Sequence, residues 1–195
     1  SVAVPATAVA GDVLRVSDGR TTHVITLTSV DIGNSVSVQF TPPAQGAAIT
    51  VTATITDAAG NVSPSATDSA VRDTTATLAP GVLITDDANN DGKINAAELS
   101  LVSANVDVLV TVPVGAVVGD VLAVTDGTTT TNFVLTAPQI AAGSVTTSFT
   151  PPASGTSITV SATLTDAAGN TSPTGTDSAL RDTTATAAPV VTITE

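Results

Sequence analysis

The sequence has no cysteine, methionine, tryptophan or tyrosine, and its 195 residues include only three phenylalanines. Such a chain has no disulfide bonds and cannot build its core on aromatic rings. Contacts of Val, Ile, Leu, Ala and Thr, or bound ions, therefore have to stabilise it. No apolar run approaches the ~18 residues of a membrane span, and no segment has the pattern of a secretory signal peptide. We expect no membrane insertion and interpret the chain as an excerpt or a mature segment.

Basic residues are scarce as well. Five Lys and Arg stand against seventeen Asp and Glu, which gives a formal net charge of −12. Nucleic acid is excluded as a partner, because phosphate binding requires a basic surface. The acids are all Asp except Glu98 and Glu195. Since Asp is common in turns and among calcium ligands, this bias indicates turn chemistry together with divalent-cation sites.

What the sequence does contain is a repeat with a period near 109 residues. Val9–Leu14 returns as Val117–Leu122, an offset of 108, and Phe40–Ala44 returns as Phe149–Ala153, an offset of 109. The difference places a one-residue insertion between residues 140 and 149, where we expect a turn. Solenoid repeats run nearer 20–50 residues, so this period predicts a tandem array of separately folded domains.

The repeat divides the chain into three segments. Residues 78–188 form a complete repeat, whereas residues 1–77 form a repeat without the first strand and the acidic stretch found in residues 79–108. Residues 189–195 match Pro80–Asp86 and supply the first strand of a following repeat. We therefore expect neighbouring identical repeats in tandem to be the partners of each domain.

Alternation of apolar and hydroxyl-bearing residues predicts β-strands along the whole repeat. Residues 158–165 alternate cleanly, and residues 106–112 are almost continuously apolar. Asp126-Gly127 is a hairpin signal between two further strands. The remaining strands are expected at residues 82–85, 120–125, 130–136, 144–149 and 174–181. About seven short strands per repeat, without a helical stripe, predict an all-β fold of tandem immunoglobulin-like β-sandwiches.

The strongest chemical motif is the stretch Asp87–Glu98, which follows the twelve-residue EF-hand calcium-loop pattern. Calcium takes six to eight oxygen ligands, and this spacing wraps them around one point. The expected ligands are Asp87, Asn89, Asp91, the backbone carbonyl of Lys93, Asn95 and Glu98. Gly92 permits the sharp turn and Ile94 is expected to point inward. The alternative is an ordinary Asn-Asp-Gly turn. The segment before the motif has the pattern of a strand, and only residues 96–101 favour a short helical turn.

A second candidate calcium site lies at the junctions between repeats. Acidic residues on a loop, a linker and the following strand are expected to meet around one cation and stiffen the joint. The candidates are Asp57, Asn61, Asp73 and Asp86 at the first junction, and Asp166, Asn170, Asp182 and Glu195 at the second. The alternative is that Asp-Ala-Ala-Gly-Asn is a plain turn and that Arg72 pairs with Asp73. It stays open whether Asp12 and Asp120, each of which follows a glycine, join a site.

Three motifs on this period resemble the bacterial immunoglobulin-like repeats of giant RTX adhesins, such as biofilm adhesins and an ice-binding adhesin. They are the Asp-Ala-Ala-Gly-Asn loops, the Arg-Asp-Thr-Thr-Ala-Thr joints at residues 72–77 and 181–186, and the acidic loop. The resemblance covers essentially the whole chain. It implies a secreted, cell-surface extender that calcium stiffens and that projects a distal ligand-binding region away from the cell. The first repeat has no acidic loop, so its calcium content is not implied.

Catalysis finds no support in the sequence. The single histidine, His23, corresponds to Thr131 in the second copy, so no histidine-based constellation recurs. We expect His23 to be an exposed strand residue and the protein to be no enzyme. The alternative to a pure spacer is a repeat that itself binds a surface ligand, a glycan or ice. The run Thr128–Thr131 motivates that alternative, whereas the lack of Trp and Tyr disfavours a sugar-stacking surface.

The incomplete first repeat suggests one further partner. Without its first strand, this domain is expected to expose a sheet edge or a cleft between its sheets, which favours strand addition. The segment Val190–Thr194 of a neighbouring molecule has the matching sequence. Contacts of this kind run head to tail and build open chains.

Overall fold

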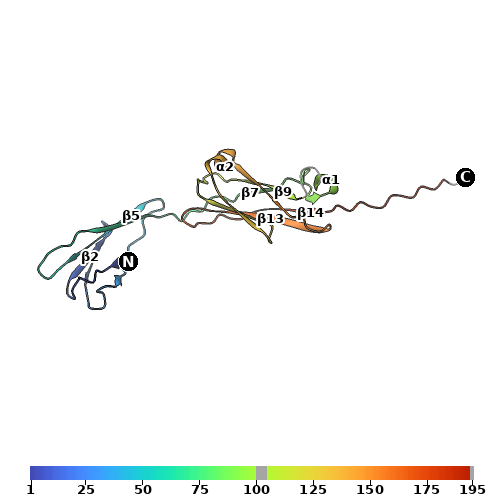
Figure 1. Cartoon of the computed structure of the whole chain (residues 1–195). Helices are drawn as coiled ribbons and strands as arrows, with labels where there is room; N and C mark the ends of the chain where they lie inside the picture. Colours follow the sequence, from blue (N-terminus) through green and yellow to red (C-terminus); the bar gives the residue numbers. More distant parts are fainter. Residues whose placement is uncertain (100–104, 194–195) are drawn as a thin grey trace. The chain divides into compact units, whose positions relative to one another are not determined.

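The computed structural model describes residues 1–99 and 105–193. The chain divides into two compact units, Ser1–Thr74 and Thr75–Glu195 (Figure 1). We call them unit 1 and unit 2. Among the described residues, no helix is both long and apolar enough to cross a membrane.

Unit 2 is a β-sandwich. Its elements are β7 (Gly81–Ile84), β8 (Lys93–Ile94), α1 (Ala96–Leu99), β9 (Val106–Thr111), β10 (Val121–Thr125), β11 (Thr130–Val134), α2 (Ala137–Ala142), β12 (Ser144–Phe149), β13 (Thr156–Thr165) and β14 (Gly175–Arg181). One sheet has the order β12-β9-β7 and the other β11-β10-β13-β14-β8. All pairs are antiparallel except β14 with β8. This division of early and late strands between two sheets is that of an immunoglobulin-like domain, so the predicted all-β fold is confirmed.

The core of unit 2 lies between the two sheets. Every second residue of β13 is buried on the inner face of its sheet, and every second residue of β9 is buried on the inner face of the other sheet. This alternation follows from the period of two residues in a strand. The buried members of the two strands are Val106, Val108, Val110, Ile158, Val160, Ala162 and Leu164. Small aliphatic side chains therefore fill the space that a tryptophan and a disulfide occupy in antibody domains.

Unit 1 repeats the same plan with a smaller second sheet. Its strands are β1 (Val2–Ala3), β2 (Val13–Ser17), β3 (Thr22–Thr26), β4 (Ser35–Val36), β5 (Ala48–Thr56) and β6 (Ala66–Val71). They form a four-stranded sheet, β3-β2-β5-β6, and a two-stranded sheet, β1-β4. Val51 and Ile55 of β5 are half-buried, whereas their counterparts Val160 and Leu164 in unit 2 are fully buried. The core of unit 1 is thus partly open.

A short helix that the sequence pattern did not predict, α2, lies next to the residue inserted into the second copy. The insertion was expected in a turn between residues 140 and 149; α2 ends at Ala142 and the turn residue Gly143 follows it. Pro138 stands in its first turn, the N–H of Thr136 donates to Oε1 of Gln139 (2.9 Å), and Gly143 ends it at a φ of 69°. These are start and stop signals of a helix. The segment is too short to show a helical stripe, which is why periodicity missed it.

Candidate metal centre

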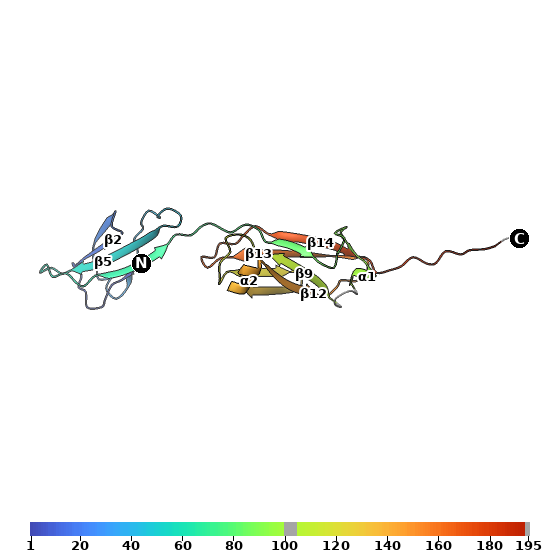
Figure 2. The ribbon, with the colours of Figure 1, turned by 90° about the horizontal axis from the view of Figure 1, so that it is seen from above.

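The acidic loop Asp87–Glu98 lies between β7 and β9 and is attached to the end of β14. The N–H of Leu180 donates to the carbonyl of Gly92 (2.8 Å), and the N–H of Asp182 donates to the carbonyl of Ile94 (2.9 Å). Figure 2 shows α1 at the end of unit 2 from which the chain leaves β14. The Ile94 side chain is fully buried in the core, as the sequence predicted for the eighth position of the motif.

Backbone hydrogen bonds hold the first three candidate ligands on one side of the loop. The Asp87 carboxylate accepts the N–H groups of Asp91 (2.9 Å) and Gly92 (2.8 Å). The side-chain oxygen of Asn89 accepts the Asp91 N–H (3.0 Å), and that of Asp91 accepts the Lys93 N–H (3.0 Å). Positive φ angles at Asn90 (54°) and Gly92 (78°) curl the chain. The loop therefore has the sharp turn that the motif predicts, with its oxygen donors gathered by its own backbone.

The second half of the loop positions the remaining candidates. The carbonyls of Gly92 and Ile94 face β14, so the alternation of a strand directs the carbonyl of Lys93 away from β14. Asn95 and Glu98 cap α1 reciprocally. The Asn95 side chain accepts the N–H groups of Ala97 and Glu98 (2.9 and 3.2 Å), and the Glu98 carboxylate accepts the Asn95 N–H (2.9 Å).

Asp86 adds a buried acid at the same end of the sandwich. It is 5% exposed, and its carboxylate accepts the N–H of Asp107 (2.7 Å). Burial raises the pKa of Asp86, and the negative charges of Asp107 and Glu98 raise it further against the lowering effect of that hydrogen bond. The negative charges of Asp107 and Glu98 therefore disfavour the ionised form of Asp86, and a cation there would offset them.

The donor set of this loop fits calcium in chemistry. It offers carboxylate, amide and backbone oxygens and no sulfur or imidazole, which is the choice of a hard cation. Within residues 1–99 and 105–193, no group of three or more His, Cys, Asp or Glu side chains is placed to hold a metal ion. The amide oxygens and the Lys93 carbonyl would thus have to complete the coordination, and calcium at this loop stays a prediction.

The structure does not bring the junction candidates together within a unit. Asp57 and Asn61 lie in the loop before β6, whereas Asp73 follows β6 at the other end of that strand. Asp166 and Asp182 stand in the same relation across β14. Six or seven residues at about 3.3 Å each separate the two ends by roughly 20 Å. Glu195 lies outside the described residues. One cation therefore cannot bind Asp57 with Asp73, or Asp166 with Asp182, of the same repeat.

The junction residues have identified partners instead. The Asp57 carboxylate accepts the N–H groups of Ala59 and Asn61 and the side-chain amide of Asn61, all at 2.8–2.9 Å. Asp166 repeats these bonds with Ala168 and Asn170. The side-chain bond from the asparagine, followed by the backbone bonds, lowers the pKa of both aspartates. Beyond the loop, Asp73 accepts the side-chain amide of Gln45 (2.6 Å).

The sequence left open a pairing of Arg72 with Asp73 and placed His23 on a strand. The guanidinium of Arg72 donates to the carbonyl of Pro43 (3.2 Å), and that of Arg181 to the carbonyl of Pro152 (2.7 Å). His23 lies on β3, where its Nε2 is 3.0 Å from the carbonyl oxygen of Gln39 and its ring packs edge-on against Phe40 at 5.0 Å. These arginines and the histidine hold strands and loops together within their units.

No protein-family model matches the chain, and no curated protein is significantly similar to it. Solved structures do resemble it, and three of them are described here. The chicken CNTN1 FN1–FN3 domains are 15% identical with a TM-score of 0.45, over 88% of this chain and 56% of that one. The fibronectin(III)-like modules of Clostridium thermocellum CbhA are 14% identical with a TM-score of 0.45, over 88% and 78%. A tetra-tandem repeat in the extending region of a large adhesion protein is 24% identical with a TM-score of 0.35, over 89% and 42%.

The chain thus spans 56% of the first of these structures and 42% of the third. Because the three TM-scores lie below 0.5, these similarities assign no function to it. The immunoglobulin-like topology follows from the strand order of unit 2 itself.

Proposed function

We propose that this chain is a structural extender of a bacterial cell-surface adhesin, in which calcium stiffens each repeat. The observation that carries the proposal is the attachment of the acidic loop to the end of β14. The carbonyl of Ile94, inside the loop, accepts the N–H of Asp182, the first residue after that strand. Whatever orders the loop therefore also orders the segment by which the chain leaves the repeat.

Calcium would supply a positive charge that holds the oxygens of Asp87, Asn89, Asp91, Lys93, Asn95 and Glu98 in one arrangement. The residues of the loop themselves attach it to the sandwich. Ile94 anchors the loop in the core, and Gly92 and Ile94 bond it to β14. A ligand that binds the folded loop and not the unfolded one stabilises the folded form by mass action. Tandem sandwiches with such joints would keep a distal binding region away from the cell.

The proposal includes a secreted location and membership of the RTX type of adhesin, with a role in biofilms. It rests on the resemblance of the loop and joint motifs and on the composition of the chain. The net charge of −12 and the lack of cysteine agree with a calcium-rich extracellular medium.

The test compares the whole chain in EDTA and in millimolar calcium. We expect calcium to raise the melting temperature and to slow hydrogen exchange at the amide of Asp182 by on the order of tenfold or more. Asp91→Asn should remove both effects. The matched control is Asp126→Asn, in the β10–β11 turn, which should leave both effects intact. If calcium changes neither quantity in the natural sequence, the loop is an ordinary turn and the proposal fails.

A repeat that binds a glycan or ice itself is the competing function. The structure gives part of its threonine run another role: the N–H and Oγ1 of Thr128 and the N–H of Thr129 all donate to Asp126 (2.6–2.9 Å). These groups shape the hairpin turn and are less free to bind a ligand. Glycan-array binding or ice shaping by the isolated chain would favour this competing function over the pure spacer.

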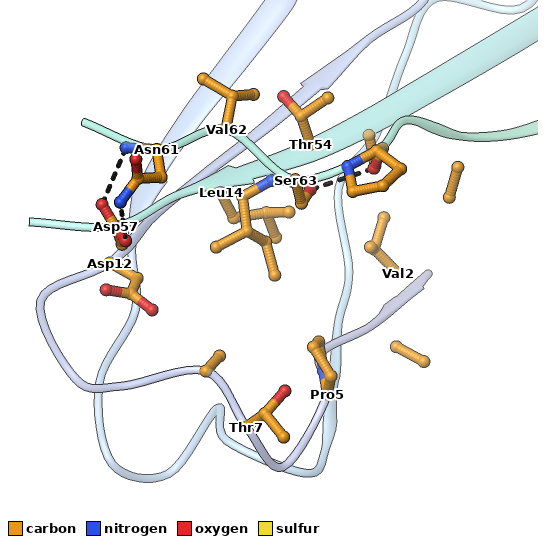
Figure 3. Close-up of a pocket in the computed structure, with 16 residues that line it drawn as sticks. Val2, Pro5, Thr7, Asp12, Leu14, Thr54, Asp57, Asn61, Val62 and Ser63 are labelled. Atoms are coloured by element: carbon orange, nitrogen blue, oxygen red, sulfur yellow. Dashed lines mark hydrogen bonds between the residues drawn. The ribbon is translucent and has the colours of Figure 1, made fainter. Parts of the chain in front are cut away.

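Head-to-tail strand addition remains part of the proposal for this chain. Unit 1 has two neighbouring cavities of about 490 and 470 Å³, which strands of both its sheets line and which share Val2, Ala3 and Ala53. Figure 3 shows the first of them. In unit 2, β7 pairs with β9, with Val82 opposite Val110. The same register would place Val191 of a second molecule opposite Val2 of β1. Val190, Val191 and Ile193 are 91, 85 and 91% exposed, so they are free to make this contact.

Sedimentation velocity over a concentration series tests the strand addition. The average mass is expected to rise with protein concentration. Val191→Asp should abolish this rise, because it places a charge against the apolar cavities of unit 1. Val114→Asp, at a 90% exposed position of unit 2, is the control and should associate normally. A monomer at all concentrations would show that the cavities of unit 1 are not filled in this way.

A further inference from the structure

In unit 2 a side chain of one sheet satisfies a backbone donor at the edge of the other. β7 is an edge strand, because its sheet has the order β12-β9-β7. The N–H of Thr85, just after β7, donates to the carbonyl of Asp107 (2.9 Å). Since successive N–H groups of a strand point to opposite sides, that of Ile84 points away from β9. Oδ2 of Asp177, on β14, accepts it (2.8 Å).

Unit 1 has the same carboxylate without this donor. Asp68 of β6 is the counterpart of Asp177, 109 positions earlier in the sequence. Its Oδ1 accepts the N–H of Ser69 (2.9 Å), as Oδ1 of Asp177 accepts that of Ser178 (2.8 Å). The two carboxylates are thus held in the same way. Within residues 1–99 and 105–193, no group donates to Oδ2 of Asp68, and the side chain is exposed.

Asp68 lies at the wall of an apolar cavity. It lines the cavity of about 470 Å³ together with Val2 of β1 and Val51 of β5. Val51 is only half-buried, whereas its counterpart Val160 in unit 2 is fully buried. The chemistry that fits this cavity is an extended segment with apolar side chains and one N–H that no strand pairs, which is what β7 supplies in unit 2.

Residues 189–193 of a second copy of the chain have this chemistry. Pro189 matches Pro80 at the entry to β7, and Ile193 matches Ile84. The apolar side chains Val191 and Ile193 are 85 and 91% exposed. In the described part of the chain, nothing accepts the N–H of Ile193. The tail thus carries both the apolar residues and the donor.

We propose that Oδ2 of Asp68 accepts the N–H of Ile193 from a second copy of this chain and thereby fixes the register in which the tail enters unit 1. The inference rests on the strand addition of the proposed function and names the residue that specifies it. A slip by one residue would turn this N–H away from Asp68 and place the polar Thr192 in the apolar cavity.

Ala66 acts against the tail at its other end. It stands where unit 2 has Gly175, and a methyl group on Gly175 would overlap the carbonyl oxygen of Pro80. Ala66 also lines both cavities of unit 1. The carbonyl of Pro189 therefore cannot take the position that the carbonyl of Pro80 has in unit 2. Asp68 binds the end of the added strand and Ala66 hinders its beginning, so the two residues give opposite predictions.

The experiment adds a synthetic peptide of residues 187–195 to the whole chain carrying Val191→Asp, whose own tail does not compete. NMR follows the amide signals of Val2 and Ser69, which are expected to shift. Asp68→Ala should weaken the affinity by on the order of tenfold or more, because it removes a charge-assisted hydrogen bond. Ala66→Gly should strengthen it. Asp126→Asn, which removes one charge in unit 2, is the control and should leave the affinity unchanged.

A peptide with a methyl group on the backbone nitrogen of Ile193 completes a double-mutant cycle. It lacks the donor, so it should bind as weakly as the natural peptide binds Asp68→Ala, and Asp68→Ala should weaken it no further. If the two changes weaken binding additively, or if neither weakens it, Asp68 and this N–H do not meet, and the proposal is overturned while the strand addition stands. If the signals of unit 1 do not respond to the natural peptide, both are overturned.

Discussion

Gly175, the first residue of β14, lies against the backbone carbonyl of Pro80, and a methyl group added to Gly175 would overlap that carbonyl oxygen. The contact joins the five-stranded sheet to the segment that enters β7 in the other sheet. In unit 1 the corresponding residue is Ala66, and the described chain places no strand equivalent to β7 beside it. The glycine thus marks a close approach between the two sheets of the complete repeat.

Gly175→Ala is expected to destabilise unit 2 by about 1–3 kcal/mol, because the backbone of Pro80 has to move. Urea unfolding followed by NMR, which separates the two units, measures this loss. Ala66→Gly is the converse change in unit 1 and should cost no more than about 1 kcal/mol, through strand entropy alone. If Gly175→Ala leaves the free energy of unfolding unchanged, β7 is held in place without this contact.

Gly92→Ala should weaken the acidic loop through its backbone. Gly92 has a φ of 78°, and no neighbouring atom lies within 4 Å of an added Cβ. The cost of about 1–2 kcal/mol is therefore purely conformational. Gly143→Ala, at a φ of 69° after α2, carries the same strain outside the loop. If the loop binds calcium, isothermal titration should show weaker binding for Gly92→Ala and unchanged binding for Gly143→Ala.

Corresponding threonines in the two units allow a controlled test of how stability depends on pH. Asp31 accepts the hydroxyl and the N–H of Thr28 (2.6 and 2.8 Å), and these bonds lower the pKa of Asp31. A folded pKa below the unfolded value contributes stability above the unfolded pKa, and this contribution is lost as pH falls through the folded pKa. Thr28→Val should return the pKa of Asp31 toward its usual value, as a carboxyl NMR titration would detect.

The control for this change is Thr136→Val in unit 2. Thr136 occupies the position of Thr28, but its partner is the neutral Gln139. Its loss should weaken the cap of α2 equally at pH 3 and pH 7, because neither group titrates. A pH-dependent effect of Thr136→Val would show that the acid-sensitive step lies elsewhere in the protein.

Ser172 offers a test of burial with its counterpart Ser63. In unit 2 the Ser172 hydroxyl accepts the N–H of Leu164 (2.9 Å) and is 5% exposed. In unit 1, Ser63 makes the same bond to Ile55 (2.9 Å) at an exposed position. Ser172→Ala leaves a buried N–H unpaired and should cost about 1–3 kcal/mol in chemical denaturation. Ser63→Ala should cost clearly less, since water can replace the hydroxyl; equal losses would show that unit 1 is closed at this point in solution.

Much of the fold is predictable because it depends on short stretches of sequence. The alternation of residues 158–165 has a period of two and fixes which side of β13 faces the core. The spacing of Asp87, Asn89 and Asp91 likewise determines the curl of the acidic loop, because each of these side chains accepts a backbone N–H within five residues. The helix α2 is an exception, since capping residues rather than periodicity form it.

The sequence by itself thus determined the strands, the repeat and the acidic loop, all of which follow from contacts between near neighbours along the chain. Only the tertiary structure decided which distant groups meet. Strand length separates Asp166 from Asp182 by the span of β14, which excludes the expected pairing of loop and joint within a repeat. Strand register instead pairs Val121 with Thr165, 44 positions along the sequence, so Asp120 and Asp166 follow at the same end of these two strands. Hydrogen-bonded pairing between strands sets both relationships, and the spacing of residues along the chain does not encode it.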